Sequence, residues 1–257
     1  MDVHDLDYNA ADARAAGRRT PIGVLRATSV TTWLIVINVA VFAIESLLLW
    51  RGYGYRVFIP IAPYRVEVMT FSPIDWWGHF SAATALARGQ VWRFITFQFI
   101  HAGLLHLLFN MLALFMFGQF VESYLGRVRF LAFYLVCGIG GALAYLGLWV
   151  VGLLVYEPWV PLVGASAGIF GVILAAAMIA PDEIVVLLFP PIPMRLKTLA
   201  FGLLVVAAAT VLMGGRNAGG EAAHIGGAVV GVLLMRFPRS MNGFARATPV
   251  RWIEDER

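Results

Sequence analysis

Ser166 and His224 are polar residues inside otherwise apolar stretches, and together they could carry out nucleophilic catalysis. Ser166 stands in GASAG near the start of one apolar run, and His224 stands in AHIGG within the last run. A serine hydroxyl is a weak nucleophile until a base accepts its proton, and an imidazole that titrates near neutrality can accept that proton and return it to a leaving group. These residue types predict Ser166 as the nucleophile and His224 as the general base and acid.

His106 and Asn110 form a second polar pair within an apolar run. They are four residues apart in HLLFN, so on a helix their side chains share one face about one turn apart. A tetrahedral intermediate needs preorganised donors, each worth roughly 2.7–4 kcal/mol in well-studied enzymes. We therefore predict His106 and Asn110 as oxyanion donors, beside the backbone N–H of Ser166 at a helix start. His101, at the rim of the same run, is predicted to support them.

Carboxylates and metal ligands are scarce around these residues. No Asp or Glu lies within the apolar runs near His224, which predicts a serine–histidine dyad rather than a triad. Glu221, three residues before His224, could touch and orient it, but a glutamate at a helix start is more often solvated, and we expect it to be so here. His101 and His106 are five apart rather than on one helical face, HExxH is absent from the sequence, and Cys137 is the only cysteine. The sequence therefore predicts neither a metal ion nor a cofactor.

The elements that must position these residues follow from composition. Of 257 residues, 60% are hydrophobic and 13% charged, whereas soluble domains average roughly 25% charged residues. About 20 helical residues cross a bilayer core, and six apolar runs are candidates, near 30–50, 98–120, 129–153, 164–180, 197–213 and 222–236. Residues 51–95 are rich in aromatics that suit the headgroup region. We therefore expect an all-α membrane protein, a bundle of six transmembrane helices with a long membrane-associated loop between the first two.

The basic residues predict the orientation in the membrane. Most of the 19 Lys and Arg residues lie before the first run, after the last, or in the even-numbered connections, so both termini are predicted to be cytoplasmic. The formal net charge of +4 requires no nucleic-acid partner, because basic loops favour an anionic leaflet. We predict a flexible cytoplasmic tail over 1–27, the six-helix domain over 28–237 and a cytoplasmic tail over 238–257. The short, featureless tails favour a bacterial plasma (inner) membrane.

Four motifs follow one another along the chain. They are Trp92–Arg93, HxxxxHxxxN at His101, His106 and Asn110, GxSx from Gly164 to Ser166, and AHxGG from Ala223 to Gly227. GxSx alone is a weak signal, but four motifs in this order across six apolar runs resemble the rhomboid intramembrane proteases. The resemblance covers residues from about 30 to 236.

This resemblance implies a serine endopeptidase in which Ser166 and His224 form the dyad, with Phe170 packed against the catalytic imidazole. It also implies an oxyanion site at His106 and Asn110, and a hydrophilic cavity open to the extracytoplasmic side. The implied substrates are single-span membrane proteins, cleaved in or near the transmembrane segment.

The remaining motif residues have supporting structural roles in this interpretation. Trp92 and Arg93 are expected to anchor the long loop. Gly164 and Gly227 are expected to allow close approach of neighbouring segments.

One residue departs from the rhomboid pattern, one alternative function stays open, and one segment predicts how a substrate enters. Ala167 follows the nucleophile where most rhomboids have glycine, and its methyl group is expected to narrow the site. The main alternative function is a catalytically inactive rhomboid-like protein that binds membrane helices, although both dyad positions are filled here. The glycine-rich segment MGGRNAGGE before the last run is predicted to let the fifth helix move and admit a substrate helix laterally.

Overall fold

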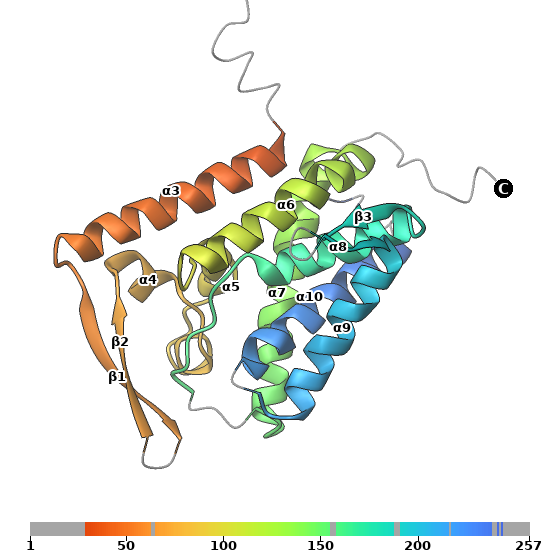
Figure 1. Cartoon of the computed structure of the whole chain (residues 1–257). Coiled ribbons are helices and arrows are strands. Elements are labelled where there is room, and N and C mark those ends of the chain that lie inside the picture. The colour runs from red at the N-terminus through yellow and green to blue at the C-terminus, as the bar shows by residue number, and fades with distance from the viewer. Residues whose placement is uncertain are drawn as a thin grey trace, which may run out of the picture.

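The computed structural model describes residues 29–62, 65–154, 158–187, 191–215, 217–237, 241 and 243. Most of these residues are helical (Figure 1). The tails predicted over 1–27 and 238–257 lie outside the described residues, apart from 241 and 243.

The helices and strands are named here in chain order. The helices are α3 (Val30–Trp50), α4 (Pro73–Gly78), the π-helix η1 (Ala83–Ala87), α5 (Arg93–Thr96), the 3-10 helix η2 (Phe97–Phe99), α6 (Leu104–Leu125), α7 (Arg127–Val150), α8 (Ser166–Ile179), α9 (Leu196–Leu212) and α10 (Ala218–Arg236). The strands are β1 (Tyr55–Ala62), β2 (Arg65–Phe71), β3 (Ile184–Val186) and β4 (Pro193–Arg195).

Within the described part of the chain, four helices are long and apolar enough to cross a membrane, namely α3, α6, α7 and α10. The apolar helices α8 and α9 are shorter, with 14 and 17 residues. Each predicted apolar run overlaps one of these helices, but the second run begins too early. Residues 97–99 form a 3-10 turn and Gly103 is extended, so α6 begins only at Leu104.

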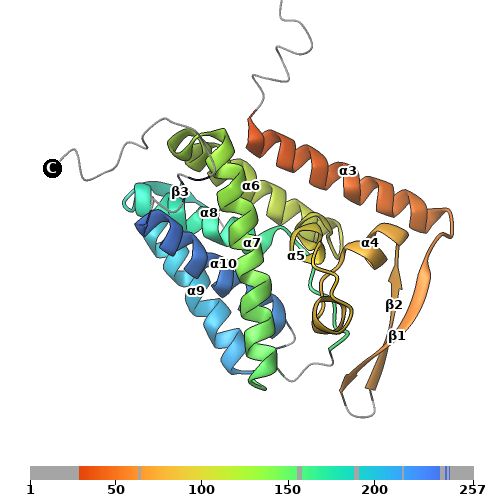
Figure 2. The ribbon, with the colours of Figure 1, turned by 180° about the vertical axis from the view of Figure 1, so that it is seen from behind.

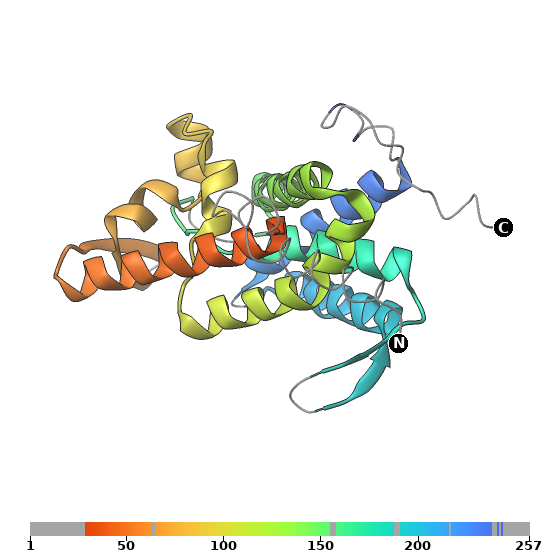
Figure 3. The same cartoon turned by 90° about the horizontal axis from the view of Figure 1, so that it is seen from above.

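Two antiparallel hairpins make the all-α prediction wrong in part. Strands β1 and β2 pair from Tyr55 opposite Phe71, and β3 pairs with β4 between α8 and α9 (Figure 3). Along β1 and β2, buried Ile59 and Phe71 alternate with exposed Phe58 and Val68. This period of two is typical of a strand with one covered face. The aromatics of the connection had indicated only an interfacial loop.

Helix α10 packs most extensively against α7 and α8 and less against α9 (Figure 2). The interface with α8 is built on glycine. A Cβ at Gly227 would collide with the backbone carbonyl of Ala167, and a Cβ at Gly231 would lie 2.7 Å from the Cα of Gly171. The two helices therefore approach at backbone distance, which small residues allow.

Helix α3 is attached to α6 by a buried carboxylate. Glu122 of α6 accepts hydrogen bonds from the backbone N–H groups of Val30 at 2.7 Å and Thr31 at 2.8 Å, and from the Thr31 hydroxyl at 2.7 Å. These bonds satisfy N–H groups that lack partners at the start of a helix. Because α6 carries His106 and Asn110, this attachment also supports one wall of the site.

Candidate active site

Ser166 is the first residue of α8 and follows a tightly held loop. The backbone N–H of Gly164 donates to the carbonyl of Phe97 at 2.9 Å, and Leu162 pairs with Phe80 in an isolated bridge. Gly164 has φ +127°, and a Cβ there would lie 2.8 Å from the His106 ring. Glycine is therefore required at position 164 both by its backbone angle and by the closeness of the imidazole.

His224 of α10 faces Ser166 directly. Its Nε2 lies 2.8 Å from Ser166 Oγ, which is hydrogen-bonding distance. The imidazole also stacks on Phe170, with ring centroids 4.2 Å apart and planes at 12°. Phe170 lies one helical turn after Ser166, so α8 supplies both the serine and the aromatic ring that contact the imidazole.

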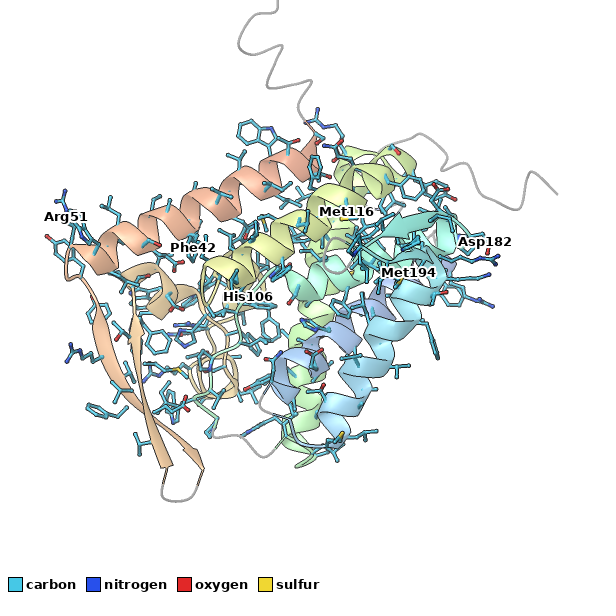
Figure 4. All side chains as sticks on the ribbon, in the orientation of Figure 1. Phe42, Arg51, His106, Met116, Asp182 and Met194 are labelled. Carbon is cyan, nitrogen blue, oxygen red and sulfur yellow. The ribbon has the colours of Figure 1, made fainter. Side chains whose placement is uncertain are left out.

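His106 and Asn110 lie on the opposite wall, on one face of α6. His106 Nδ1 accepts from the Ala102 backbone N–H at 3.4 Å, which leaves Nε2 as the protonated nitrogen in a neutral ring. Asn110 donates one N–H to the His106 carbonyl at 2.8 Å and has a second amide hydrogen to offer. Figure 4 labels His106 near the start of α6, far from Asp182 and Met194 at the other end of the helices.

These four residues line one cavity of about 890 Å³, and Phe170 and Leu203 of α9 also contribute to its wall. The lining comes mainly from α6, α8, α9, α10 and the loop before α8, and Phe97 of η2 and Tyr145 of α7 also contribute. A space of this size can hold a stretch of extended peptide beside the Ser166 hydroxyl.

Among the predicted supporting residues, His101, Trp92 and Arg93 do not line the cavity. His101 is buried with its ring centroid 5.2 Å from that of His106, and burial lowers its pKa to about 3, so its imidazole is neutral. Arg93 donates to the carbonyls of Trp76, at 2.8 Å, and His79, and Trp92 donates to the Trp77 carbonyl at 3.1 Å. These bonds hold the connection between α3 and α6 together.

The methyl group of Ala167 fits between the helices without a collision. It is buried, and its methyl group lies against Gly141 of α7, where the absence of a side chain leaves room. The effect of Ala167 on the substrate side of the cavity stays a prediction.

Glu221 is the residue that the sequence analysis misjudged. Its Oε2 lies 2.8 Å from His224 Nδ1, and its side chain is only 19% exposed. The expectation of a solvated residue was therefore wrong, and a carboxylate does reach the histidine. The spacing of three residues between Glu221 and His224 allowed this contact, because it places two helical side chains side by side.

No group of three or more His, Cys, Asp or Glu side chains in the described ranges could hold a metal ion. The polar side chains of the cavity include Ser166 and His224, which lie within hydrogen-bonding distance of each other.

A family model for the Rhomboid domain matches residues 88–239. The chain belongs to the rhomboid family. Among its relatives, Rhomboid protease AarA of Providencia stuartii is 34% identical over 158 residues, which are 57% of this rhomboid and 55% of AarA. Rhomboid protease GluP of Bacillus subtilis is 40% identical over 95 residues, 37% of this chain and 17% of GluP.

A third relative, Putative rhomboid protease YdcA of Bacillus subtilis, is 42% identical over 87 residues, 34% of this chain and 40% of YdcA. This rhomboid therefore matches about half or less of the length of each of these proteins. The apolar helices, together with relatives that are named proteases, indicate that this rhomboid is an integral membrane protein of a family that contains proteases.

Proposed function

We propose that this rhomboid is an intramembrane serine endopeptidase that hydrolyses a peptide bond in or near the transmembrane segment of single-span membrane proteins. The observation that carries the proposal is the 2.8 Å approach of His224 Nε2 to Ser166 Oγ at the wall of the cavity. Its support at family level is the set of relatives named proteases.

The first half of the reaction forms an acyl-enzyme. Ser166 Oγ attacks the carbonyl carbon of the scissile bond while its proton passes to His224 Nε2. The negative charge that develops on the carbonyl oxygen is stabilised by N–H groups of His106, Asn110 and the Ser166 backbone. The C–N bond then breaks, and His224 returns the proton to the leaving amine.

The second half uses water from the cavity. His224 accepts a proton from that water, the hydroxide attacks the ester carbonyl, and the proton returns to Ser166 Oγ as the new carboxylic acid leaves. Water is thus consumed and the free serine restored. No metal ion or cofactor takes part in this scheme.

The membrane arrangement is part of the proposal. We assign six transmembrane helices, α3, α6, α7, α8, α9 and α10, within a domain over 28–237, with the connection after α3 resting on the membrane and both termini in the cytoplasm of a bacterial cell. The short helices α8 and α9, of 14 and 17 residues, can span the bilayer with help from their flanking segments.

The test is cleavage of a single-span substrate in liposomes. The wild type is expected to cleave with or without EDTA, and Ser166→Ala and His224→Ala are each expected to lose at least roughly 10³-fold in kcat. Ser123→Ala, at an exposed position of α6, is the matched control and should cleave like the wild type. A wild type that binds membrane helices but cleaves none of them would favour the inactive, helix-binding alternative.

A further inference from the structure

The side chains at the start of α10 form a hydrogen-bonded chain that continues beyond the serine and histidine. Ser166 Oγ lies 2.8 Å from His224 Nε2, His224 Nδ1 lies 2.8 Å from Glu221 Oε2, and Asn217 donates to Glu221 Oε1 at 3.3 Å. The His224 and Glu221 side chains are 15% and 19% exposed, so the bond between them is shielded from most of the solvent.

The carboxylate determines which imidazole nitrogen can act as a base. An ionised carboxylate only accepts hydrogen bonds, so the Glu221 contact requires a proton on Nδ1 of His224. In a neutral ring, Nε2 then carries the lone pair, and this is the nitrogen that faces Ser166. The wrong tautomer would present an N–H to the serine and could not accept its proton.

The surroundings of Glu221 suit a charged carboxylate. It lies in the first turn of α10, where the positive end of the helix dipole favours an anion, and Asn217 donates to its other oxygen. When His224 takes the serine proton, the facing anion stabilises the imidazolium that forms. Phe170 fixes the plane of the ring by stacking, and Glu221 fixes which edge of the ring points at the serine.

We propose that Glu221 is a positioning residue that holds His224 in the tautomer and orientation needed to activate Ser166, so that this rhomboid uses a Ser166–His224–Glu221 arrangement. This inference rests on the proposed function, because it assigns Glu221 a role in the reaction of the same site. Glu221 acts through His224 and touches neither the substrate nor the reacting atoms.

The experiment measures kcat and KM for the single-span substrate in the full-length protein. Glu221→Gln is expected to lower kcat about 10²-fold with KM nearly unchanged. The loss should be smaller than the roughly 10⁴-fold effect of removing a buried triad carboxylate, because Glu221 retains some contact with solvent. Glu221→Asp keeps the charge on a shorter side chain and should recover a clear part of the lost kcat. Glu183→Gln makes the same chemical change at an exposed loop position and should match the wild type.

Thermal unfolding of each variant separates positioning from simple stabilisation of α10. Positioning predicts that kcat falls while the unfolding midpoint of Glu221→Gln stays near that of the wild type. The proposal is overturned by wild-type kcat in Glu221→Gln, by a loss of kcat that only follows a loss of stability, or by Glu221→Asp performing no better than Glu221→Gln. A wild type that neither cleaves nor reacts with a fluorophosphonate overturns the proposed function, and this failure is visible without any Glu221 variant.

Discussion

Helix α10 packs closely against α8, which carries Ser166, and less closely against α9, which lines the cavity. The first contact positions the proposed reacting residues, and the second concerns how a substrate reaches them. Against α8, Gly227 and Gly231 bring the two backbones together and place His224 beside Ser166. Against α9 the contact is less extensive, and α9 also has positions that face open space, such as Gly202, where a Cβ would meet nothing within 4 Å. The reacting pair thus lies on a closed interface, while a wall of the cavity comes from a more loosely packed helix.

The largest expected effect comes from adding one methyl group to the closed interface. In Gly227→Ala the new Cβ collides with the Ala167 carbonyl, and backbone atoms cannot move aside as a flexible side chain can. Overpacking of this kind costs about 1–3 kcal/mol, and a shift of about 1 Å between reacting groups can cost 10²-fold in rate. We expect Gly227→Ala to lose both thermal stability and at least about 10²-fold of its cleavage rate.

Gly202→Ala is the matched control on α9. The same methyl group enters open space there, so stability should be unchanged or slightly higher, since alanine is a better helix former than glycine by roughly 1 kcal/mol. Cleavage and thermal unfolding are measured for both variants. Equal losses in the two would contradict the distinction between the closely packed α8–α10 interface and an open position on α9.

A second test restrains α9 without touching the reacting pair. Ala113 of α6 and Leu203 of α9 both line the cavity, and the single native cysteine, Cys137, is buried. Cysteines placed at 113 and 203 and joined by a reducible bifunctional thiol reagent are expected to stop cleavage of a transmembrane substrate, with recovery on reduction. The single-cysteine variants treated in the same way are the controls, and unimpaired cleavage by the joined protein would exclude a lateral gate between α6 and α9.

The sequence was informative where polar residues interrupt apolar runs. Ser166, His224, His106 and Asn110 could be selected from residue type and spacing alone, because a polar group in a membrane helix needs a cavity or a partner. Their distances could not be predicted, since these depend on how closely α8 and α10 approach. Glu221 was expected in solvent because a glutamate at a helix start is more often solvated than bound to a neighbouring side chain, although its spacing from His224 allowed the contact.

The β1–β2 hairpin was missed for a different reason. Buried and exposed side chains alternate along its strands, but the residue types do not, since exposed Phe58 and Val68 are as apolar as buried Ile59 and Phe71. A strand is predicted from alternating apolar and polar residues, and without that alternation the aromatic residues of the connection indicate only a preference for the membrane interface.

The smallest expected effect concerns the connection that precedes α6. Burial raises the pKa of Asp75 to about 7, against the attraction of Arg93, and burial lowers the pKa of His79 to about 4. A carboxyl group whose pKa is raised on folding stabilises the folded state at pH values below its unfolded pKa, which is near 4. This contribution is lost as the pH rises through the folded pKa of about 7. The neutral side chain in Asp75→Asn does not lose this contribution. The unfolding midpoint of the variant minus that of the wild type should therefore be about 2–4 °C larger at pH 8 than at pH 5.

Cleavage at a fixed pH serves as the control for Asp75→Asn, because Asp75 lies in the connection and not on the cavity wall. Turnover is expected to match that of the wild type. A midpoint difference that is the same at pH 5 and pH 8 would show that Asp75 does not take up a proton on folding.

The most direct measurement of the central claim is the site at which a fluorophosphonate attaches. We expect a single covalent adduct, located by mass spectrometry on Ser166, that forms in the wild type and is lost in His224→Ala. An adduct on another serine, or labelling of Ser166 that proceeds equally well without His224, would contradict the assignment of these two residues as nucleophile and base.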